Sequence, residues 1–194
     1  MNGFVNKMKR LLDIALSLLA LLILSPVILL LSILVALKLG RPVLFRQKRP
    51  GLKGKVFEML KFRSMRDAVD EQGNVLPDSK RLISFGKKLR STSLDELPSL
   101  WSVLKGDMSI VGPRPLSVLH YERDLAQGNV TRRMLKGGLL GLGHINKGTS
   151  EMGKADYEYE YIDKYLKYSW VDLLRLDCFI IWKGLILILK GGGH

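Results

Sequence analysis

A long apolar segment dominates the pattern of hydrophobic and polar positions in this chain. It runs from Leu11 to Leu37 and is interrupted near its middle by Ser25 and Pro26. Such a run is long enough for a membrane helix, since about 20 apolar residues suffice to cross a bilayer. Because Lys and Arg near a membrane segment favour the cytoplasmic side, basic residues on both flanks place both flanks on one face. These residues are Lys7, Lys9 and Arg10 before the run and Lys38, Arg41, Arg46, Lys48 and Arg49 after it.

A kinked, re-entrant helix satisfies this charge pattern better than a straight span. Pro26 lacks an N–H and its ring clashes with the carbonyl of Leu22, so a helix should kink or break near Ser25, whose hydroxyl can bond a freed backbone group. Each half then has about 13 residues and a length of roughly 20 Å, too short for a hydrocarbon core of about 30 Å. Two alternatives are a cleaved signal peptide, which would have a shorter apolar stretch, and a straight transmembrane helix, which tolerates proline. Asp13 weighs against the straight span, because a carboxylate is more stable at the interface.

The pattern after this run predicts short strands followed by helices. Strands are expected at residues 42–45 and 56–63, joined by a turn at 49–55, with a polar loop at 67–80. Further expected segments are a helix at 82–89, a helix at 94–104 ended by Gly106, an extended stretch at 112–115, a loop at 137–148 close to a ligand or another backbone, and helical structure at 156–189. The last apolar stretch, 178–189, is too short to span and should lie in the membrane interface or pack on the anchor.

The chain is strongly basic, and its charge is concentrated. The formal net charge is +13, and residues 41–66 hold nine Lys or Arg against the single acid Glu58. Directly after a membrane segment, such a block is attracted to anionic head groups by about 1 kcal/mol per basic residue. A solvated surface or a nucleic-acid patch is the alternative. We expect anionic membrane lipids and phosphate-bearing ligands as partners, and no nucleic acid, because no nucleic-acid-binding motif accompanies the basic block.

Cysteine and histidine give no sign of a disulfide framework or a metal centre. Cys178 is the single cysteine and cannot form an internal disulfide, which agrees with a reducing cytoplasmic compartment. The histidines, His120, His144 and His194, stand far apart with no cysteine nearby.

Two adjacent acids, Asp95 and Glu96, are the strongest candidates for chemistry. Ser93-x-x-Glu96 matches a capping box, in which both side chains would satisfy backbone donors at a helix start. Asp95 would then lie in the first helical turn, where the macrodipole keeps the carboxylate ionised as a nucleophile or metal ligand. Adjacent acids point in different directions on a helix, so one can face a phosphorus atom while the other holds a metal ion. That division suits phosphoryl transfer, which depends on positioning and charge neutralisation.

Cations that could neutralise phosphate oxygens are near these acids in the sequence. Arg90 precedes them, and Lys61 and Arg63 lie in the string Lys-Phe-Arg-Ser-Met. Arg114 stands between two prolines, which fix φ, so its guanidinium is presented from a preorganised backbone and can bind phosphate through two hydrogen bonds. A surface arginine in a turn is the alternative for Arg114.

In order along the chain, these strings resemble those of the bacterial sugar transferases, or monotopic phosphoglycosyl transferases. The resemblance covers roughly residues 5 to 175. The chain is similar to the short form of the family, without the extra membrane bundle and cofactor-like domain of longer members. It rests on the basic-flanked anchor with Ser25-Pro26, the strings Arg46-Gln47-Lys48-Arg49-Pro50-Gly51 and Lys61-Phe62-Arg63-Ser64-Met65, residues 90–98 around Asp95-Glu96, and residues 104–115, which end in Gly112-Pro113-Arg114-Pro115.

The resemblance implies transfer of a phospho-sugar from a UDP-sugar donor to polyprenol (undecaprenyl) phosphate, with release of UMP. It implies that Asp95 attacks the β-phosphorus and forms a covalent intermediate, and that Glu96 binds Mg²⁺ as the cofactor. Arg114 and Arg90 would hold phosphate groups, with Lys61 and Arg63 as weaker candidates for the same role. The implied location is the cytoplasmic face of the bacterial inner membrane, at the first membrane step of surface glycan or glycoconjugate synthesis.

One stretch departs from the family pattern. Where the family commonly has a Thr-Gly-Leu-Ala-Gln-Val-Asn-Gly-Arg-like sequence, this chain has residues 140–148, Leu-Gly-Leu-Gly-His-Ile-Asn-Lys-Gly. Donor recognition around His144 and Lys147 is therefore open, and the sequence does not name the sugar, the glycan pathway or the oligomeric state, a homodimer included. Two other functions compete: a non-catalytic basic membrane tether, and a glycosyltransferase that moves only the sugar and releases UDP.

Together these observations predict a mainly helical α+β fold. A kinked re-entrant membrane helix would precede a small cytoplasmic catalytic domain with interfacial amphipathic helices. The predicted division is an anchor at residues 1–40, the catalytic domain at 41–175, and a C-terminal interfacial or packing helix with its tail at 176–194. At 194 residues, the chain has room for one modest domain besides the anchor.

Overall fold

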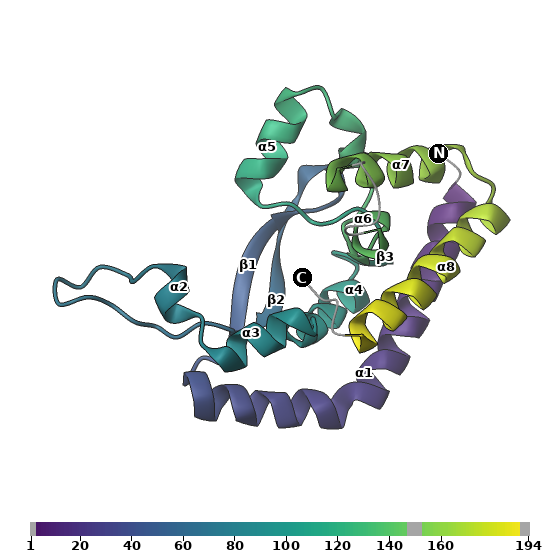
Figure 1. Cartoon of the computed structure of the whole chain (residues 1–194). Helices are drawn as coiled ribbons and strands as arrows, with labels where there is room; N and C mark the ends of the chain where they lie inside the picture. The colour runs from purple at the N-terminus through teal and green to yellow at the C-terminus, as the bar shows by residue number, and fades with distance from the viewer. Residues whose placement is uncertain (1–2, 147–152, 191–194) are drawn as a thin grey trace.

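The protein is mainly helical (Figure 1), and its described residues also form two small two-stranded sheets. The computed structural model describes residues 3–146 and 153–190. This agrees with the predicted mainly helical α+β class. The elements in chain order are α1 (Gly3–Leu39), β1 (Leu44–Pro50), η1 (Leu52–Gly54), β2 (Val56–Phe62), α2 (Asp78–Arg81), α3 (Ser84–Ser91), η2 (Leu94–Ser99), α4 (Leu100–Lys105), β3 (Ser109–Val111), α5 (Val118–Ala126), η3 (Val130–Met134), β4 (Gly138–Leu140), α6 (Leu142–Ile145), α7 (Lys154–Lys167) and α8 (Trp170–Leu189).

The apolar run forms α1, which bends sharply near its middle (Figure 1). Pro26 lies inside the helix, and the Ser25 hydroxyl donates a 2.8 Å hydrogen bond to the carbonyl of Leu22. This is the carbonyl that a proline four residues later leaves without its backbone donor. By length and composition, α1 is the one helix in the described ranges that could cross a membrane, and its 18-residue window of mean hydropathy 3.0 is only 11% buried. The predicted kink is confirmed, and the helix bends there without breaking.

Both ends of α1 pack on the same small domain. In the first half, Arg10 donates two 2.6 Å hydrogen bonds to the carbonyls of Val103 and Leu104, at the end of α4. In the second half, Val35 is fully buried in a cluster that also contains Phe62 of β2 and Leu89 of α3. A straight 37-residue helix would separate its ends by about 55 Å, so the bend is what allows both contacts.

Strands β1 and β2 form the predicted hairpin. They pair antiparallel, with Phe45 opposite Lys61 and Arg49 opposite Phe57. Alternate residues of a strand share a face, so Lys61 lies on the same face as Gln47 and Arg49. The first strand is longer than predicted and extends through the basic residues to Pro50.

The segment containing the two acids is a 3₁₀ helix that leads into α4, and the predicted capping box is wrong. Ser93 is in the left-handed region, with φ of 54°, and makes no side-chain cap hydrogen bond. Pro98 lies within η2, and a proline cannot donate the backbone hydrogen bond that a longer α-helix would need there. Gly106 ends α4 with φ of 95°, as predicted from its position.

The glycines of 112–141 bring two backbones into close contact. Strands β3 and β4 pair in parallel, and a Cβ on Gly138 would lie 2.1 Å from the nitrogen of Gly112. One on Gly141 would lie 2.5 Å from the Gly112 carbonyl oxygen. The prediction of a close backbone approach is confirmed, whereas the prediction of a loop throughout 137–148 is wrong, because β4 and α6 occupy part of it. With three and four residues, the strand and the helix are too short for their hydrophobic periods to be visible in the sequence.

The C-terminal helices cover the domain and approach the anchor. The predicted helical region divides into α7 and α8, with Ser169 capping α8 through the backbone nitrogen of Asp172. Asp177 of α8 forms a 2.5 Å ion pair with Lys9 of α1, so the two helices lie beside each other (Figure 1). The 178–189 stretch therefore packs near the anchor, while Phe179 and Trp182 are exposed on its other side.

Other predicted boundaries shift by a few residues. The polar loop from residue 67 projects from the domain, with an isolated antiparallel bridge between Val69 and Val75, and helix α2 begins at Asp78 (Figure 1). The helix predicted at 82–89 is α3, two residues later. The division into regions 1–40, 41–175 and 176–194 stays a prediction.

Candidate active site

A cavity of about 600 Å³ brings the predicted site residues together. Asp95, at the start of η2, is 8% exposed and lines this cavity with five basic residues. Four of them are the predicted cations Lys61, Arg63, Arg90 and Arg114, from β2, the segment after it, α3 and the segment after β3, and the fifth is Arg81 of α2. A buried carboxylate beside several cations is a site where an anion such as a diphosphate can be held and attacked.

Glu96 forms an ion pair with Lys61. Its Oε1 lies 2.5 Å from Nζ of Lys61, and both side chains are largely buried. Glu96 also lines a small cavity next to the large one, together with Arg49, Lys61 and Arg114. The two adjacent acids therefore point to different surroundings, as the sequence predicted for residues that divide two tasks.

Two other basic residues of the large cavity, Arg63 and Arg90, differ in their contacts. Arg63 is tied to the protein itself, since its guanidinium donates to the carbonyls of Met65 and Arg41 and forms a 2.6 Å ion pair with Asp67. Arg90 donates from Nε to the Ser64 hydroxyl at 2.9 Å. Arg63 thus shapes the cavity wall, while Arg90 keeps donors for a ligand.

The close approach of α3 to residue 64 depends on Gly86. A Cβ at Gly86 would lie 1.9 Å from the carbonyl oxygen of Ser64, so only glycine fits there. This contact sets the distance between α3 and the end of β2, and with it the place of Arg90 against Ser64. No local sequence pattern indicated this requirement.

Arg114 is presented from a backbone that other side chains hold in place. Its N–H donates to Oε2 of Glu158 at 2.5 Å, and its carbonyl accepts from Nη1 of Arg132 at 3.1 Å. Its side chain lines both the large and the small cavity. The predicted preorganised presentation of Arg114 therefore has a physical basis beyond its two prolines.

Arg49 is a site residue that sequence reasoning missed. It donates to the carbonyl of Pro115 at 3.1 Å and to Oε1 of Gln47 at 2.7 Å. Burial, and then the positive charge of Arg114, lower its pKa, while Glu96 acts in the opposite direction. Gln47, Arg49 and Lys61 share one face of the observed hairpin, whereas the sequence pattern places Arg49 in the turn, so strand alternation was not applied to it.

The carboxylates at this site suit only a magnesium ion that takes few ligands from the protein. Among residues 3–146 and 153–190, no group of three or more His, Cys, Asp or Glu side chains could hold a metal ion. Mg²⁺ keeps several waters and is commonly bound by one or two carboxylates plus substrate phosphates. Glu96 alone is compatible with that mode, in which a diphosphate and water would supply the remaining ligands.

The atypical stretch 140–148 lies partly at this site. His144, on α6, lines the small cavity with Glu96, Arg49 and Arg114. Lys147, the other residue in doubt, lies outside the described residues. His144 is thus close enough to the cluster to affect what binds there.

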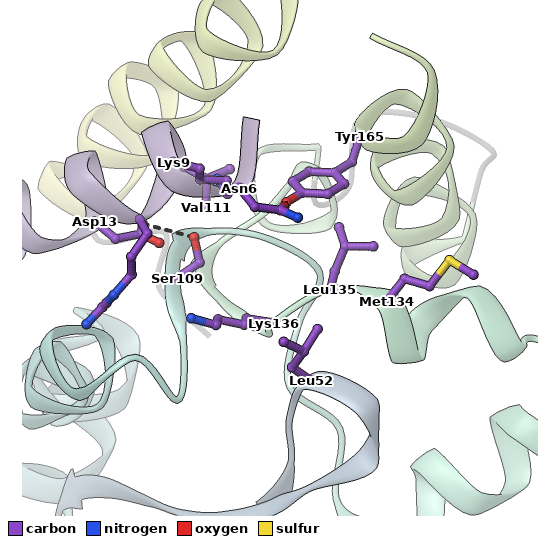
Figure 2. Close-up of a pocket in the computed structure, with 11 residues that line it drawn as sticks. Asn6, Lys9, Asp13, Leu52, Ser109, Val111, Met134, Leu135, Lys136 and Tyr165 are labelled. Carbon is purple, nitrogen blue, oxygen red and sulfur yellow. Dashed lines mark hydrogen bonds between the residues drawn. The ribbon is translucent and has the colours of Figure 1, made fainter. Parts of the chain in front are cut away.

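A second cavity, of about 190 Å³, lies between the first half of α1, β3 and the loop before β4 (Figure 2). At its wall, Asp13 accepts hydrogen bonds of 2.9 Å from the Ser109 hydroxyl and from the backbone nitrogen of Ile110. Lys136 also lines it, and burial followed by the charge of Arg10 lowers the Lys136 pKa. The residues lining this cavity do not include Asp95 or the cations around it, so it is separate from the candidate active site.

Known proteins resemble this chain over almost its whole length. The family model described as "Bacterial sugar transferase" matches residues 4–191. The uncharacterized sugar transferase EpsL of Bacillus subtilis (strain 168) is 39% identical over 181 residues, which cover 92% of this chain and 88% of that protein. The UDP-glucose:undecaprenyl-phosphate glucose-1-phosphate transferases of Klebsiella pneumoniae and Escherichia coli (strain K12) are 40% and 37% identical over 96% of this chain.

The chain spans less than half of the two glucose-1-phosphate transferases, since the matched regions cover 42% of each. The match to EpsL, in contrast, includes most of both proteins. The family match begins at the second residue of α1 and ends two residues beyond α8, so it includes the bent helix, the hairpin and the residues around Asp95. This chain belongs to the bacterial sugar transferase family.

Proposed function

We propose that this protein transfers a phospho-sugar from a UDP-sugar to polyprenol (undecaprenyl) phosphate and releases UMP. The observation that carries the proposal is the cavity in which buried Asp95 lies with Lys61, Arg63, Arg90 and Arg114. The printed names of the Klebsiella and Escherichia relatives state a reaction of this type for those proteins. The product would begin the assembly of a surface glycan or glycoconjugate.

Asp95 would act as the nucleophile. Its carboxylate oxygen attacks the β-phosphorus of the donor, the bond from that phosphorus to the bridging oxygen breaks, and UMP leaves with the electron pair. In the second step, an oxygen of polyprenol phosphate attacks the same phosphorus, and the Asp95 carboxylate is released. Phosphoryl transfer of this kind needs little beyond alignment and charge neutralisation.

The basic residues would hold the phosphates. Arg114 and Arg90 present guanidinium donors at the cavity, and Arg–phosphate pairs are frequently bidentate. Lys61 contributes a point charge between Glu96 and the cavity. Arg63, with its contacts to residues 41, 65 and 67, mainly shapes the wall.

Glu96 would hold Mg²⁺ together with oxygens of the bound diphosphate. The ion supplies charge stabilisation at the phosphate oxygens. Glu96 is adjacent to Asp95 but faces Lys61, so it can serve the cation without occupying the nucleophile.

The anchor would enter and leave the membrane on the cytoplasmic face of the bacterial inner membrane. Supporting this, the first half of α1 contacts α4 and β3 while the second half contacts β2 and α3, so both ends lie on one domain. The exposed apolar side chains between these contacts include Leu22, Ile23, Leu29 and Leu30, which would face the lipid. Both basic flanks then lie at the same surface, next to anionic head groups.

Topology can be tested with introduced cysteines in a Cys178→Ser background. Lys7→Cys and Lys55→Cys are both at exposed positions. In closed inner-membrane vesicles of known orientation, both sites should react with a membrane-impermeant maleimide from the same side. Labelling from opposite sides would establish a straight span and refute the re-entrant topology.

The reaction can be tested by product analysis with a panel of UDP-sugars, polyprenol phosphate and Mg²⁺. We expect UMP from at least one donor, and a fall of about a thousandfold or more in the Asp95→Asn variant. Asp163→Asn, which changes an exposed acid on α7, is the matched control and should retain activity. Parental rates in Asp95→Asn would show that the nucleophile assignment is wrong.

The covalent intermediate has its own experiment. Incubation of the enzyme with donor and no lipid should add the mass of a phospho-sugar to the peptide containing Asp95. UMP release without such an adduct would indicate direct attack by the lipid phosphate.

The same product analysis separates the two competing functions. Release of UDP would identify a glycosyltransferase, and no product with any donor would favour the basic membrane tether. The buried cluster around Asp95 favours catalysis over the tether, because a tether does not need a buried carboxylate among cations.

A further inference from the structure

We propose that Glu158 is a positioning residue that fixes the backbone of Arg114 for binding the phosphates of the donor. This inference rests on the proposed function of the site. Glu158 lies on α7 and is 6% exposed. It is 44 residues from Arg114 in the sequence and reaches it only through the tertiary fold.

The Pro113-Arg114-Pro115 segment has a single backbone donor. Prolines have no N–H, so the amide of Arg114 is the only hydrogen-bond donor in these three residues. Its acceptor is Oε2 of Glu158, at 2.5 Å. A charged acceptor makes this bond stronger than one between neutral groups.

The carbonyl of Arg114 is held from another direction. Nη1 of Arg132 donates to it at 3.1 Å, while Nε of Arg132 bonds to Asp124 at 2.8 Å. The Arg132 guanidinium also lies 5.5 Å from the ring centre of Tyr159, which donates a hydrogen bond to Asp124. Burial, followed by that hydrogen bond, raises the Tyr159 pKa to about 12, so its hydroxyl remains a donor at neutral pH.

The carbonyls on either side of Arg114 are bound as well. Pro113 accepts from the backbone nitrogen of Gly138 at 2.8 Å, and Pro115 accepts from Nη1 of Arg49 at 3.1 Å. Three successive carbonyls and the one N–H therefore have partners from α7, η3, β4 and β1. These bonds leave the guanidinium of Arg114 at the cavity as the part of the residue that serves a ligand.

Glu158 differs from an ordinary core acid because its helix, α7, supports Arg114 at two points. Its neighbour on the helix, Tyr159, supports Arg132, so α7 supplies both the acceptor for the Arg114 amide and part of the support for the donor to its carbonyl. Burying a carboxylate is costly unless it is hydrogen-bonded, which gives the pairing with the Arg114 amide a stabilising role. Loss of the carboxylate should free the Arg114 backbone before it unfolds the domain.

The kinetic test compares Glu158→Ala with Glu158→Gln. Glu158→Ala removes the acceptor and should lower kcat/KM for the UDP-sugar by about ten- to a hundredfold. Glu158→Gln keeps an acceptor oxygen and should restore most of that loss. The matched control is Glu160→Ala, which removes a more exposed acid of the same helix and should leave the activity unchanged.

A double-mutant cycle with Arg114→Ala separates positioning from general damage. If Glu158 acts through Arg114, Glu158→Ala should cause no further loss in the Arg114→Ala background. Independent losses that multiply, or equal losses in the Gln and Ala variants, would overturn the proposal.

Hydrogen exchange gives a readout that does not depend on activity. A peptide covering residues 112–116 has backbone amides only at Gly112, Arg114 and Leu116, because the other two residues are prolines. The Arg114 amide should lose protection in Glu158→Ala and keep it in Glu158→Gln, which changes the exchange of this peptide by one amide. Unchanged exchange in Glu158→Ala would refute the positioning role. If the wild-type protein released no UMP while this exchange pattern was observed, the proposed function would fail and the positioning of Arg114 would stand.

Discussion

Lys61 and Glu96, 35 residues apart in the sequence, form an ion pair of 2.5 Å in which the two side chains are only 16% and 13% exposed. Glu96 is the acid we propose as the Mg²⁺ ligand, and Lys61 also lines the cavity that holds Asp95. If Glu96 binds Mg²⁺ as proposed, Lys61 and the divalent cation would compete for one carboxylate. Donor phosphates would attract the Lys61 ammonium and release Glu96 for the ion.

This competition predicts opposite effects on rate and on metal dependence. Lys61→Ala should lower kcat/KM for the donor by about tenfold or more, because a cation at the phosphates is lost. The same variant should need less Mg²⁺ for half-maximal UMP release, because Glu96 no longer has a bound ammonium to displace. The measurement is a Mg²⁺ titration at saturating donor.

The control for that titration is Lys164→Ala, which breaks a 2.5 Å ion pair with Glu160 on α7 away from the cavity. Its half-saturating Mg²⁺ concentration should equal that of the wild type. An unchanged or increased Mg²⁺ requirement in Lys61→Ala would rule out the competition.

Substitution of Pro26 should alter the path of α1. Alanine restores the backbone donor to Leu22 and removes the steric cause of the bend, so α1 should straighten. Val35 and Leu39 would then lose their contacts with Phe62 and Leu89. We expect a lower unfolding temperature in detergent micelles and reduced labelling of Lys55→Cys from the original side.

Ser32→Ala is the comparison for that variant. Ser32 also donates to a carbonyl of α1, that of Ile28 at 2.7 Å, without an associated proline. It should leave both measurements unchanged. A Pro26→Ala protein with wild-type stability and labelling would mean that packing alone bends the helix.

Gly86→Ala should disturb the phosphate-binding side of the cavity. The new Cβ would lie 1.9 Å from the carbonyl oxygen of Ser64, so α3 must move and Arg90 must move with it. Overpacking of this kind costs about 1–3 kcal/mol of unfolding free energy. Denaturant unfolding should show that loss, and KM for the donor should rise.

Gly3→Ala adds the same methyl group where no atom lies within 4 Å, and it provides the reference. If Gly86→Ala matched Gly3→Ala in stability and KM, the close packing of α3 on Ser64 would not determine the site.

Lys136 predicts a pH dependence of stability. Burial, followed by Arg10, lowers its pKa in the folded protein, while Asp13 and Asp107 oppose the shift. In the pH range between the lowered pKa and the ordinary lysine value of 10.5, the unfolded chain binds more protons than the folded one, so this group makes stability rise with pH. Lys136→Met should raise the unfolding temperature near pH 8. It should also remove the part of the increase in stability with pH that Lys136 causes.

The measurement is thermal unfolding of both proteins from pH 7 to pH 10. Lys105→Met is a suitable control, because Lys105 is an exposed cation at the end of α4. A Lys136→Met protein less stable than the wild type near pH 8 would contradict the prediction, and would mean that the Lys136 charge stabilises Asp13 more than it repels Arg10.

Much of the fold and of the candidate site follows from local sequence features. Pro26 within an apolar run predicts the kink, alternation predicts the β1–β2 hairpin, and Gly106 predicts the end of α4. The prediction of a capping box was wrong, because many short turns have the same sequence pattern. Here Ser93 adopts a left-handed conformation before a 3₁₀ helix. Local patterns identify residue types and spacings, and they constrain backbone conformation only loosely.

The sequence by itself determined the long apolar run and its basic flanks, and it identified Asp95, Glu96, Arg90 and Arg114 as candidates for phosphate chemistry. Only the tertiary structure decided that Lys61 pairs with Glu96, that Arg49 and Arg132 hold the carbonyls around Arg114, and that Glu158 takes its N–H. The physical reason is that hydrophobic periodicity and backbone propensity act over a few residues. Contacts between α7 and the segment after β3 depend instead on the close packing of distant segments, such as Gly138 against Gly112, which no local pattern records.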